Sequence, residues 1–163
     1  MMNLFSCNIC EKISKYEISL RALNINNNLG NIPRGLKIGM KAGFLNITED
    51  EKTVVIPFSL NIVGVEGVVK EEEEVAVRKE SLENIDMNDE EVLFEINIIH
   101  ELRLEFREKT KFEGKDLEVL KDYAYFMLEP TISELVSSLG AKIGIGGLRI
   151  PRNVRKFKDG NNN

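Results

Sequence analysis

The chain has 163 residues, of which 42% are hydrophobic and 30% are charged, a composition typical of one globular domain with a sizeable core. Acidic residues outnumber basic residues by 27 to 22, giving a formal net charge of −5, which argues against a nucleic-acid-binding protein. No apolar run reaches the roughly 18 residues needed to span a bilayer, and the first residues lack the basic and apolar regions of a signal peptide, so we expect a cytoplasmic protein without membrane insertion.

Cys7 and Cys10 form a C-x-x-C pair near the start of the chain. This spacing occurs in zinc sites and in redox-active thioredoxin-like units. Here there is no second cysteine pair, the one histidine is His100, and no βαβ pattern surrounds the motif. We therefore interpret the pair as a chance spacing and expect no metal site.

Apolar and polar residues alternate with a period of two in the first part of the chain, which predicts two strands. The first strand places Tyr16, Ile18, Leu20 and Ala22 on one face. Residues 24–34 (NINNNLGNIPR) predict a loop. The second strand has one apolar face, made of Leu36, Ile38, Met40, Ala42 and Phe44.

Gly39 and Gly43 lie on the opposite face of the second strand. Glycines at such positions allow strong bending or a close backbone approach. The tract 46–52 (NITEDEK) then predicts a turn.

A third strand is predicted over 53–64 (TVVIPFSLNIVG), with an alternating apolar face. Pro57 cannot donate a ladder hydrogen bond, so we expect it at an edge, a bulge or a strand start. A fourth strand is predicted over 92–106, where one face is apolar except for His100 and the other carries charged residues from Glu101 to Arg107. Fifteen alternating residues require a strand that curves or continues past its neighbours.

An acidic insertion, residues 66–91 with EEEE at 71–74, separates the last two strands. A hairpin needs only a few residues, so we expect a solvated loop here, with partner docking as the alternative. We expect one domain over residues 1–163, ending in a disordered tail at 156–163.

After the fourth strand the period becomes helical. Apolar residues repeat at Leu117, Leu120, Ala124 and Met127, and again at Ile132, Leu135, Val136 and Leu139. Pro130 lies between the two runs, so it either kinks one long helix or belongs to the first turn of a second helix. Strands grouped ahead of helices predict an α+β fold: a four-stranded antiparallel meander sheet covered by a long C-terminal helix.

Four glycines, Gly140, Gly144, Gly146 and Gly147, follow the predicted helix. A phosphate-binding loop must precede a helix, because the N–H groups at the helix N-terminus hold the anion. We therefore expect no nucleotide site and predict Gly140 as a left-handed C-cap.

The remaining polar residues do not form a catalytic pattern. His100 is either a hydrogen-bonded core or interface histidine or a catalytic base, and no nucleophile motif accompanies it. Glu101, Glu105 and Glu108 fit the solvated side and end of a strand. We therefore predict no enzyme, no catalytic, cofactor-binding or metal-binding residue and no cofactor. A basic tail could contact an acidic partner or the acidic insertion; it consists of Arg149, Arg152, Arg155, Lys156 and Lys158.

The order of elements, the helix end ISELVSSLG (132–140) and the segment LRIPRNV (148–154) resemble the bacterial protein-export chaperone SecB and its relatives. Leu148, Ile150, Pro151 and Asn153 stand where that family has an apolar pair, a proline and an asparagine. Arg152 stands where the family has a small apolar residue.

This resemblance implies an ATP-independent cytosolic chaperone that assembles as a homotetramer, a dimer of dimers. It would hold unfolded polypeptides for protein export, with hand-over to SecA, or guard a dedicated partner such as an antitoxin. The acidic insertion and the Pro-Arg-Asn sequence favour the dedicated partner. The alternatives are a small-molecule-binding protein, in which a curved sheet and a helix enclose an apolar pocket, and a structural or phage-assembly protein.

Overall fold

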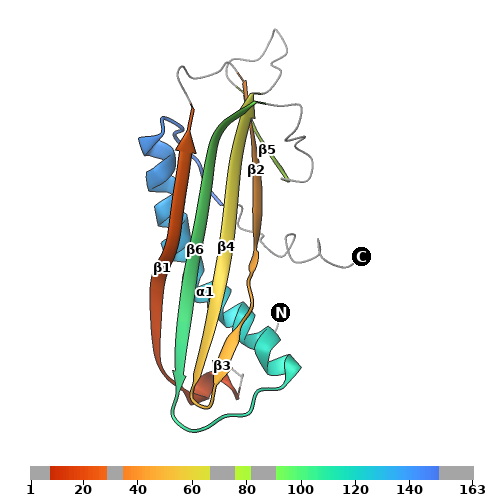
Figure 1. The fold of residues 1–163 in the computed structure, drawn as a ribbon, viewed down its shortest axis with the longest axis vertical. Helices are drawn as coiled ribbons and strands as arrows, with labels where there is room; N and C mark the ends of the chain where they lie inside the picture. The colour runs from red at the N-terminus through yellow and green to blue at the C-terminus, as the bar shows by residue number, and fades with distance from the viewer. Residues whose placement is uncertain (1–7, 29–34, 67–75, 82–90, 151–163) are drawn as a thin grey trace.

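The computed structural model describes residues 8–28, 35–66, 76–81 and 91–150. Figure 1 shows one sheet of long strands with a single long helix crossing one face obliquely, from the side of β2 and β3 to the side of β1. The elements in chain order are η2 (Cys10–Lys12), β1 (Ile13–Asn27), β2 (Gly35–Phe44), β3 (Thr48–Asp50), β4 (Thr53–Glu66), β5 (Ala76–Ser81), β6 (Val92–Phe106) and α1 (Gly114–Lys142).

The sheet has the order β1-β6-β4-β2-β5, and the short β3 pairs with β4. All pairs are antiparallel except β2 with β5. The predicted α+β class, an antiparallel sheet covered by one long C-terminal helix, is confirmed. One detail of the meander is wrong, because β1 pairs with β6 and not with β2.

Strand β1 is longer than the sequence pattern indicates. Residues 24–27, predicted as part of a loop, continue the strand, with Ile25 opposite Ile96 and Asn27 opposite Phe94. Pairing with the fifteen-residue β6 outweighs the turn preference of this asparagine-rich stretch. Residues 29–34 of the predicted loop lie outside the described residues.

Two other predicted loops also contain strand residues. Thr48–Asp50 of the predicted turn form β3. Ala76–Ser81 of the acidic insertion form β5, and most of that insertion lies outside the described part of the chain, as does the predicted tail 156–163.

Pro57 lies inside β4, a strand with neighbours on both sides. Its carbonyl accepts a hydrogen bond from Leu45 N–H at 2.9 Å. Pairing with β2 stops at Phe58, and pairing with β3 starts at Val55. The missing N–H of Pro57 therefore falls in the gap between two partner strands, which reconciles a proline with a central strand.

The core lies between the sheet and α1. The inward side chains of β2, β4 and β6 alternate as the sequence predicts, and those from Val54 to Ile62 on β4 are at most 3% exposed. Opposite them, α1 buries one stripe, spaced mostly by four residues: Leu120, Ala124, Leu128, Ile132, Val136 and Leu139. Pro130 lies within this single helix, so the one-helix alternative holds.

The helix ends later than predicted, and Gly140 is not its left-handed cap. Gly140 is helical and buried, while Gly144 has the positive φ of 87°. The chain then folds back, with Ile145 N–H donating to Gly140 C=O at 2.7 Å. A Cβ on Gly140 would lie 2.6 Å from Leu148 Cβ, so glycine is needed here for a close approach and not for a turn.

Gly140→Ala is expected to lower the free energy of unfolding by up to about 2 kcal/mol. The added methyl overpacks the contact with Leu148, which costs about 1–3 kcal/mol, and alanine recovers roughly 1 kcal/mol in helix propensity. Urea unfolding measures the change. Gly146→Ala is the matched control, since its Cβ would meet nothing within 4 Å; equal stability of the two variants would contradict the prediction.

Candidate polypeptide-binding surface

Strand β1 is the edge strand at one end of the sheet. Thirteen of its fifteen residues pair with β6 along one side. No described strand pairs with its other side, so part of the β1 backbone has no ladder partner within the described residues. A long edge of this kind is a template for pairing with another chain.

One face of this edge strand is apolar and only partly covered. It points to the same side as α1, because its residues pair with core residues of β6. Tyr16 is 52% exposed, Leu20 46%, Leu23 41% and Ile25 37%. We refer to this set as the β1 apolar face: Tyr16, Ile18, Leu20, Leu23 and Ile25.

A β-bulge at Arg21 determines which side chains belong to this face. Leu20 pairs with His100, but Ala22 pairs with Ile99, so Arg21 is the extra residue. Ala22 therefore points to the opposite face, contrary to the sequence prediction, and Leu23 takes its place. The Arg21 guanidinium donates to Glu101 Oε1 at 2.6 Å, and this bond raises the pKa of Arg21.

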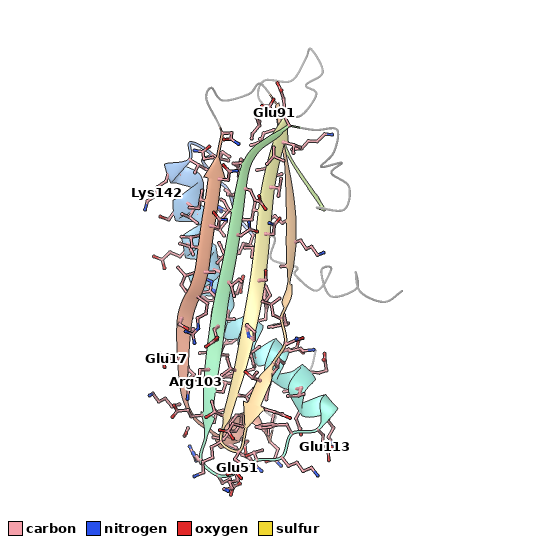
Figure 2. All side chains as sticks on the ribbon, in the orientation of Figure 1. Glu17, Glu51, Glu91, Arg103, Glu113 and Lys142 are labelled. Atoms are coloured by element: carbon pink, nitrogen blue, oxygen red, sulfur yellow. The ribbon has the colours of Figure 1, made fainter. Side chains whose placement is uncertain are left out.

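The other sheet face is polar at its centre, which contrasts with the β1 apolar face, although Val63 and Val65 form a small buried apolar cluster at one end of it. At its centre Asn61 and Asn97 both donate to Glu95 Oε1, each at 3.0 Å. Figure 2 shows Glu17 and Arg103 side by side on β1 and β6, in the register that pairs them. Covering these charged and amide groups with an apolar segment would cost the hydration they have left, so this part of the face is a poor surface for apolar segments.

The helix adds one exposed aromatic side chain. Phe126 is 59% exposed. Pro130 has no N–H to donate to the Phe126 carbonyl four residues earlier, which leaves that carbonyl without its helical donor. Sequence analysis did not single out Phe126, although its place outside the apolar stripe of α1 was readable from the spacing.

His100 lies in the core and not in an open site. It is 2% exposed, and its strand neighbours are Leu20 on β1 and Phe58 on β4. Its Nδ1 has no hydrogen-bond partner among the described residues. The same holds for the buried hydroxyl of Tyr125, whose ring packs on Phe58. Burial lowers the pKa of His100 and raises that of Tyr125 to about 12. The buried position of His100 matches the core alternative, but the hydrogen bond that we expected is missing at Nδ1 within the described part of the chain.

Lowering the pH from 7.5 to 5.5 is expected to destabilise the protein partly through His100. The unfolded chain binds a proton at this residue near pH 6.5, whereas the folded chain resists protonation, so stability is lost as the pH falls below the unfolded value. The loss is at most about 1.4 kcal/mol per pH unit for one proton.

Urea unfolding of His100→Phe at both pH values tests this expectation. The variant keeps a buried ring without a titrating group, so it should lose less stability than the native chain over this interval. An identical loss in both proteins would contradict a role for His100.

The other predicted polar residues form no shared centre. Glu101 bonds Arg21, Glu105 lies 3.9 Å from Arg103, and Glu108 lies 3.6 Å from Lys12. Cys10 is half-buried in η2 and Cys7 lies outside the described residues. Among the described residues no group of three His, Cys, Asp or Glu side chains could hold a metal ion. Arg149 is exposed, and the rest of the basic tail falls beyond the described part.

A pocket of about 480 Å³ lies at the start of α1. Leu45 and Ile47 line it from the connection after β2, and Leu117 and Lys121 line it from the helix. It borders the core between sheet and helix, because its Ile47 and Leu117 pack against the buried side chains there. The large apolar side chains that stay exposed among the described residues lie on β1, at Phe126 on α1 and at Leu45 beside this pocket.

No family model matches the chain, and no curated protein matches it. Among solved structures it is similar to the Mycobacterium tuberculosis Rv1957 SecB-like chaperone, solved in complex with a ChAD peptide from the Rv1956 HigA1 antitoxin. The TM-score is 0.58 at 12% identity, covering 83% of this chain and 86% of that chain.

The chain has a SecB-like fold. The resemblance noted in the sequence is therefore confirmed for the fold. Of the SecB-like segment 148–154, Leu148 is buried at 1% exposure and Ile150 packs against the core. Pro151 and Asn153 lie outside the described residues. Within the described residues, no helix is both long and apolar enough to cross a membrane.

Proposed function

We propose that this protein is an ATP-independent chaperone that binds extended segments of unfolded polypeptides on β1 and the adjoining surface of α1. The observation that carries the proposal is the fifteen-residue edge strand with an exposed apolar face. An extended client segment could hydrogen-bond to the β1 edge, which gives affinity independent of sequence. Client side chains would then cover the β1 apolar face.

The energetics suit reversible binding. Burying one Leu, Ile or Phe side chain contributes roughly 1.5–3 kcal/mol. Ordering an unfolded segment costs a large part of that gain. A few such contacts give a complex that holds a client and releases it without ATP. The proposal assigns no catalytic residue and no cofactor to the protein.

The solved SecB-like neighbour supports a peptide as the client, because it was captured with a segment of an antitoxin. We therefore propose a dedicated partner of the antitoxin type ahead of general protein export through SecA. The acidic sequence of residues 66–91 is consistent with this preference, because a dense run of one charge favours partners of complementary charge over others.

We also propose a cytoplasmic homotetramer, a dimer of dimers. Exposed apolar edge strands are usually managed by association. Light scattering during size-exclusion chromatography measures the native mass. A mass near four chains supports the assembly, whereas a monomer rules it out and leaves single-chain binding to be tested.

The functional test is aggregation of a reduced, slow-folding client followed by light scattering without ATP. The protein at molar excess is expected to suppress the scattering, and to do so equally when ATP is added. Unchanged aggregation would exclude a general holdase. Purification of the candidate antitoxin-type partner with and without the chain would then test the dedicated alternative.

A further inference from the structure

His100 combines deep burial with an unused hydrogen-bonding atom. The side chain is 2% exposed, and its Nδ1 has no hydrogen-bond partner among the described residues. A neutral imidazole tolerates this position better than a protonated one, because the protonated ring carries a charge and a second N–H donor. Any motion that admits water to His100 is therefore favoured by a proton.

The strands around His100 offer a protonated ring no counter-charge. Leu20 on β1 and Phe58 on β4 are its strand neighbours. The next side chains along β1, β4 and β6 on this face of the sheet are apolar: Ile18, Leu23, Ile56, Leu60, Ile98 and Leu102. Arg21 and Glu101 come next in the chain, but they bond to each other on the polar face. Protonation thus places an unpaired charge among hydrocarbon side chains.

The helix adds one titratable hydroxyl and one carboxylate near this layer of the core. Tyr125 packs on Phe58, and burial raises the pKa of Tyr125 to about 12. Glu129 acts on the Tyr125 hydroxyl and contributes to that rise in pKa. Neither group acts on His100, because burial is the one cause that lowers the pKa of this histidine among the described residues.

The weak point of the β1–β6 ladder lies directly beside His100. β1 is an edge strand, and described strands hold it on one side only. The bulge at Arg21 interrupts the ladder between the pair Leu20–His100 and the pair Ala22–Ile99, and a bulge leaves its extra residue unpaired. A β1 strand that opens at this bulge lifts Leu20 from His100 and admits water to the ring.

Opening of this kind depends on pH with a definite sign. His100 is the one histidine of the chain, and histidine is the side chain that ordinarily titrates between pH 5.5 and 7.5. Burial lowers the pKa of His100 while β1 is in place, and hydration returns the pKa toward its ordinary value of about 6.5. The open form then binds the proton more tightly, so its population rises by up to about tenfold from pH 7.5 to pH 5.5.

We propose that His100 is a proton-sensitive latch for the client-binding edge: the neutral ring keeps β1 on β6, and protonation releases β1 at the Arg21 bulge. This inference rests on the proposed function, because Leu20, which covers the latch, belongs to the β1 apolar face. A client bound across that face holds β1 in place and competes with the proton. Acidification therefore releases the client and provides a means of discharge without ATP.

The test of the latch is hydrogen–deuterium exchange at pH 7.5 and 5.5, read by mass spectrometry and corrected for the intrinsic pH dependence of amide exchange. The β1 amides that bond to β6 on both sides of Arg21 should be less protected than those of β4, because they exchange through local opening. Their protection should fall by a further factor of up to about ten at pH 5.5. Equal protection of β1 and β4 at both pH values would overturn the proposal, since β1 would then open only on global unfolding. A change in β1 protection below about twofold would overturn it as well, since the opening would not expose His100.

Three variants assign the effect to the histidine. His100→Phe keeps a buried ring without a titrating group, and His100→Gln keeps a buried polar group without one. Both should lose the pH dependence of β1 protection, whatever their overall stability. Phe58→Leu is the matched control, because it loosens the packing beside His100 and keeps the histidine, so the pH dependence should remain. A pH dependence that persists in both His100 variants would refute the latch.

Client binding gives an independent readout. Anisotropy of a labelled unfolded client should show an affinity loss from pH 7.5 to 5.5 that is at least about threefold larger for the native chain than for His100→Phe. Equal losses in the two proteins would refute the coupling while leaving the proposed function intact, because the client still binds at pH 7.5. Absence of client binding at pH 7.5 would instead refute the proposed function, and the regulatory role of the latch with it.

Discussion

Replacing Leu20 and Leu23 together with lysine is expected to weaken client binding about thirtyfold. The two side chains are 46% and 41% exposed, so a client completes roughly half of the burial of each. At about 2 kcal/mol for a whole leucine, the two losses sum to about 2 kcal/mol, and 1.4 kcal/mol corresponds to a factor of ten. Anisotropy of a labelled unfolded client at fixed ionic strength measures the change.

The matched control is Ala22→Lys with Asn24→Lys. It adds the same charge to the same strand, but these residues pair with Ile99 and Asn97 and therefore point to the polar face. Client affinity should stay within about threefold of that of the native chain. If both double variants weaken binding equally, net charge and not the β1 apolar face governs binding, and the proposed site is wrong.

Gly64→Ala is expected to destabilise the protein by about 3 kcal/mol, a decrease in Tm of roughly 6–12 °C. The added Cβ would lie 1.9 Å from Phe94 Cε1 and 2.4 Å from Phe94 Cδ1. The Phe94 ring is fully buried, so no rotamer change moves it out of the way without displacing the core. Gly64 thus provides the space into which the ring opposite it packs.

Phe94→Leu tests the cause of this destabilisation. It costs stability on its own, but it removes the ring atoms that the methyl group added by Gly64→Ala would meet, so the double variant should be about as stable as Phe94→Leu alone. The double-mutant cycle should give a coupling of at least about 1 kcal/mol. Gly43→Ala is the matched glycine control, since its Cβ would meet nothing within 4 Å. Additive effects would show that the ring is not the obstacle.

Local patterns identified most of the elements. The alternation from Val92 to Phe106 predicted β6 with its observed bounds, because a strand that packs against a helix on one face must alternate whatever its neighbours are. In the helix, the spacing of apolar residues by three and four placed Leu120, Ala124 and Ile132 on the buried stripe of α1. The α+β class followed from the order of the elements alone.

The candidate binding surface was less predictable. Tyr16, Ile18 and Leu20 were recognised as one apolar face, but Leu23 and Ile25 joined it only through the bulge at Arg21. The bulge depends on the register of β1 against a strand about eighty residues later in the chain. The exposure of the β1 apolar face depends on β1 being the edge strand. Alternation cannot distinguish an edge strand from a central one.

The sequence by itself determined where the chain alternates, where it becomes helical and which residues are apolar, because these follow from the local spacing of side chains. Only the tertiary structure decided that β1 pairs with β6, that β5 covers the edge of β2 and that Gly140 makes room for Leu148. Each of these depends on segments distant in the chain meeting in one register, and backbone hydrogen bonds, which are the same for every residue except proline, carry no sequence signal of which partner they will find.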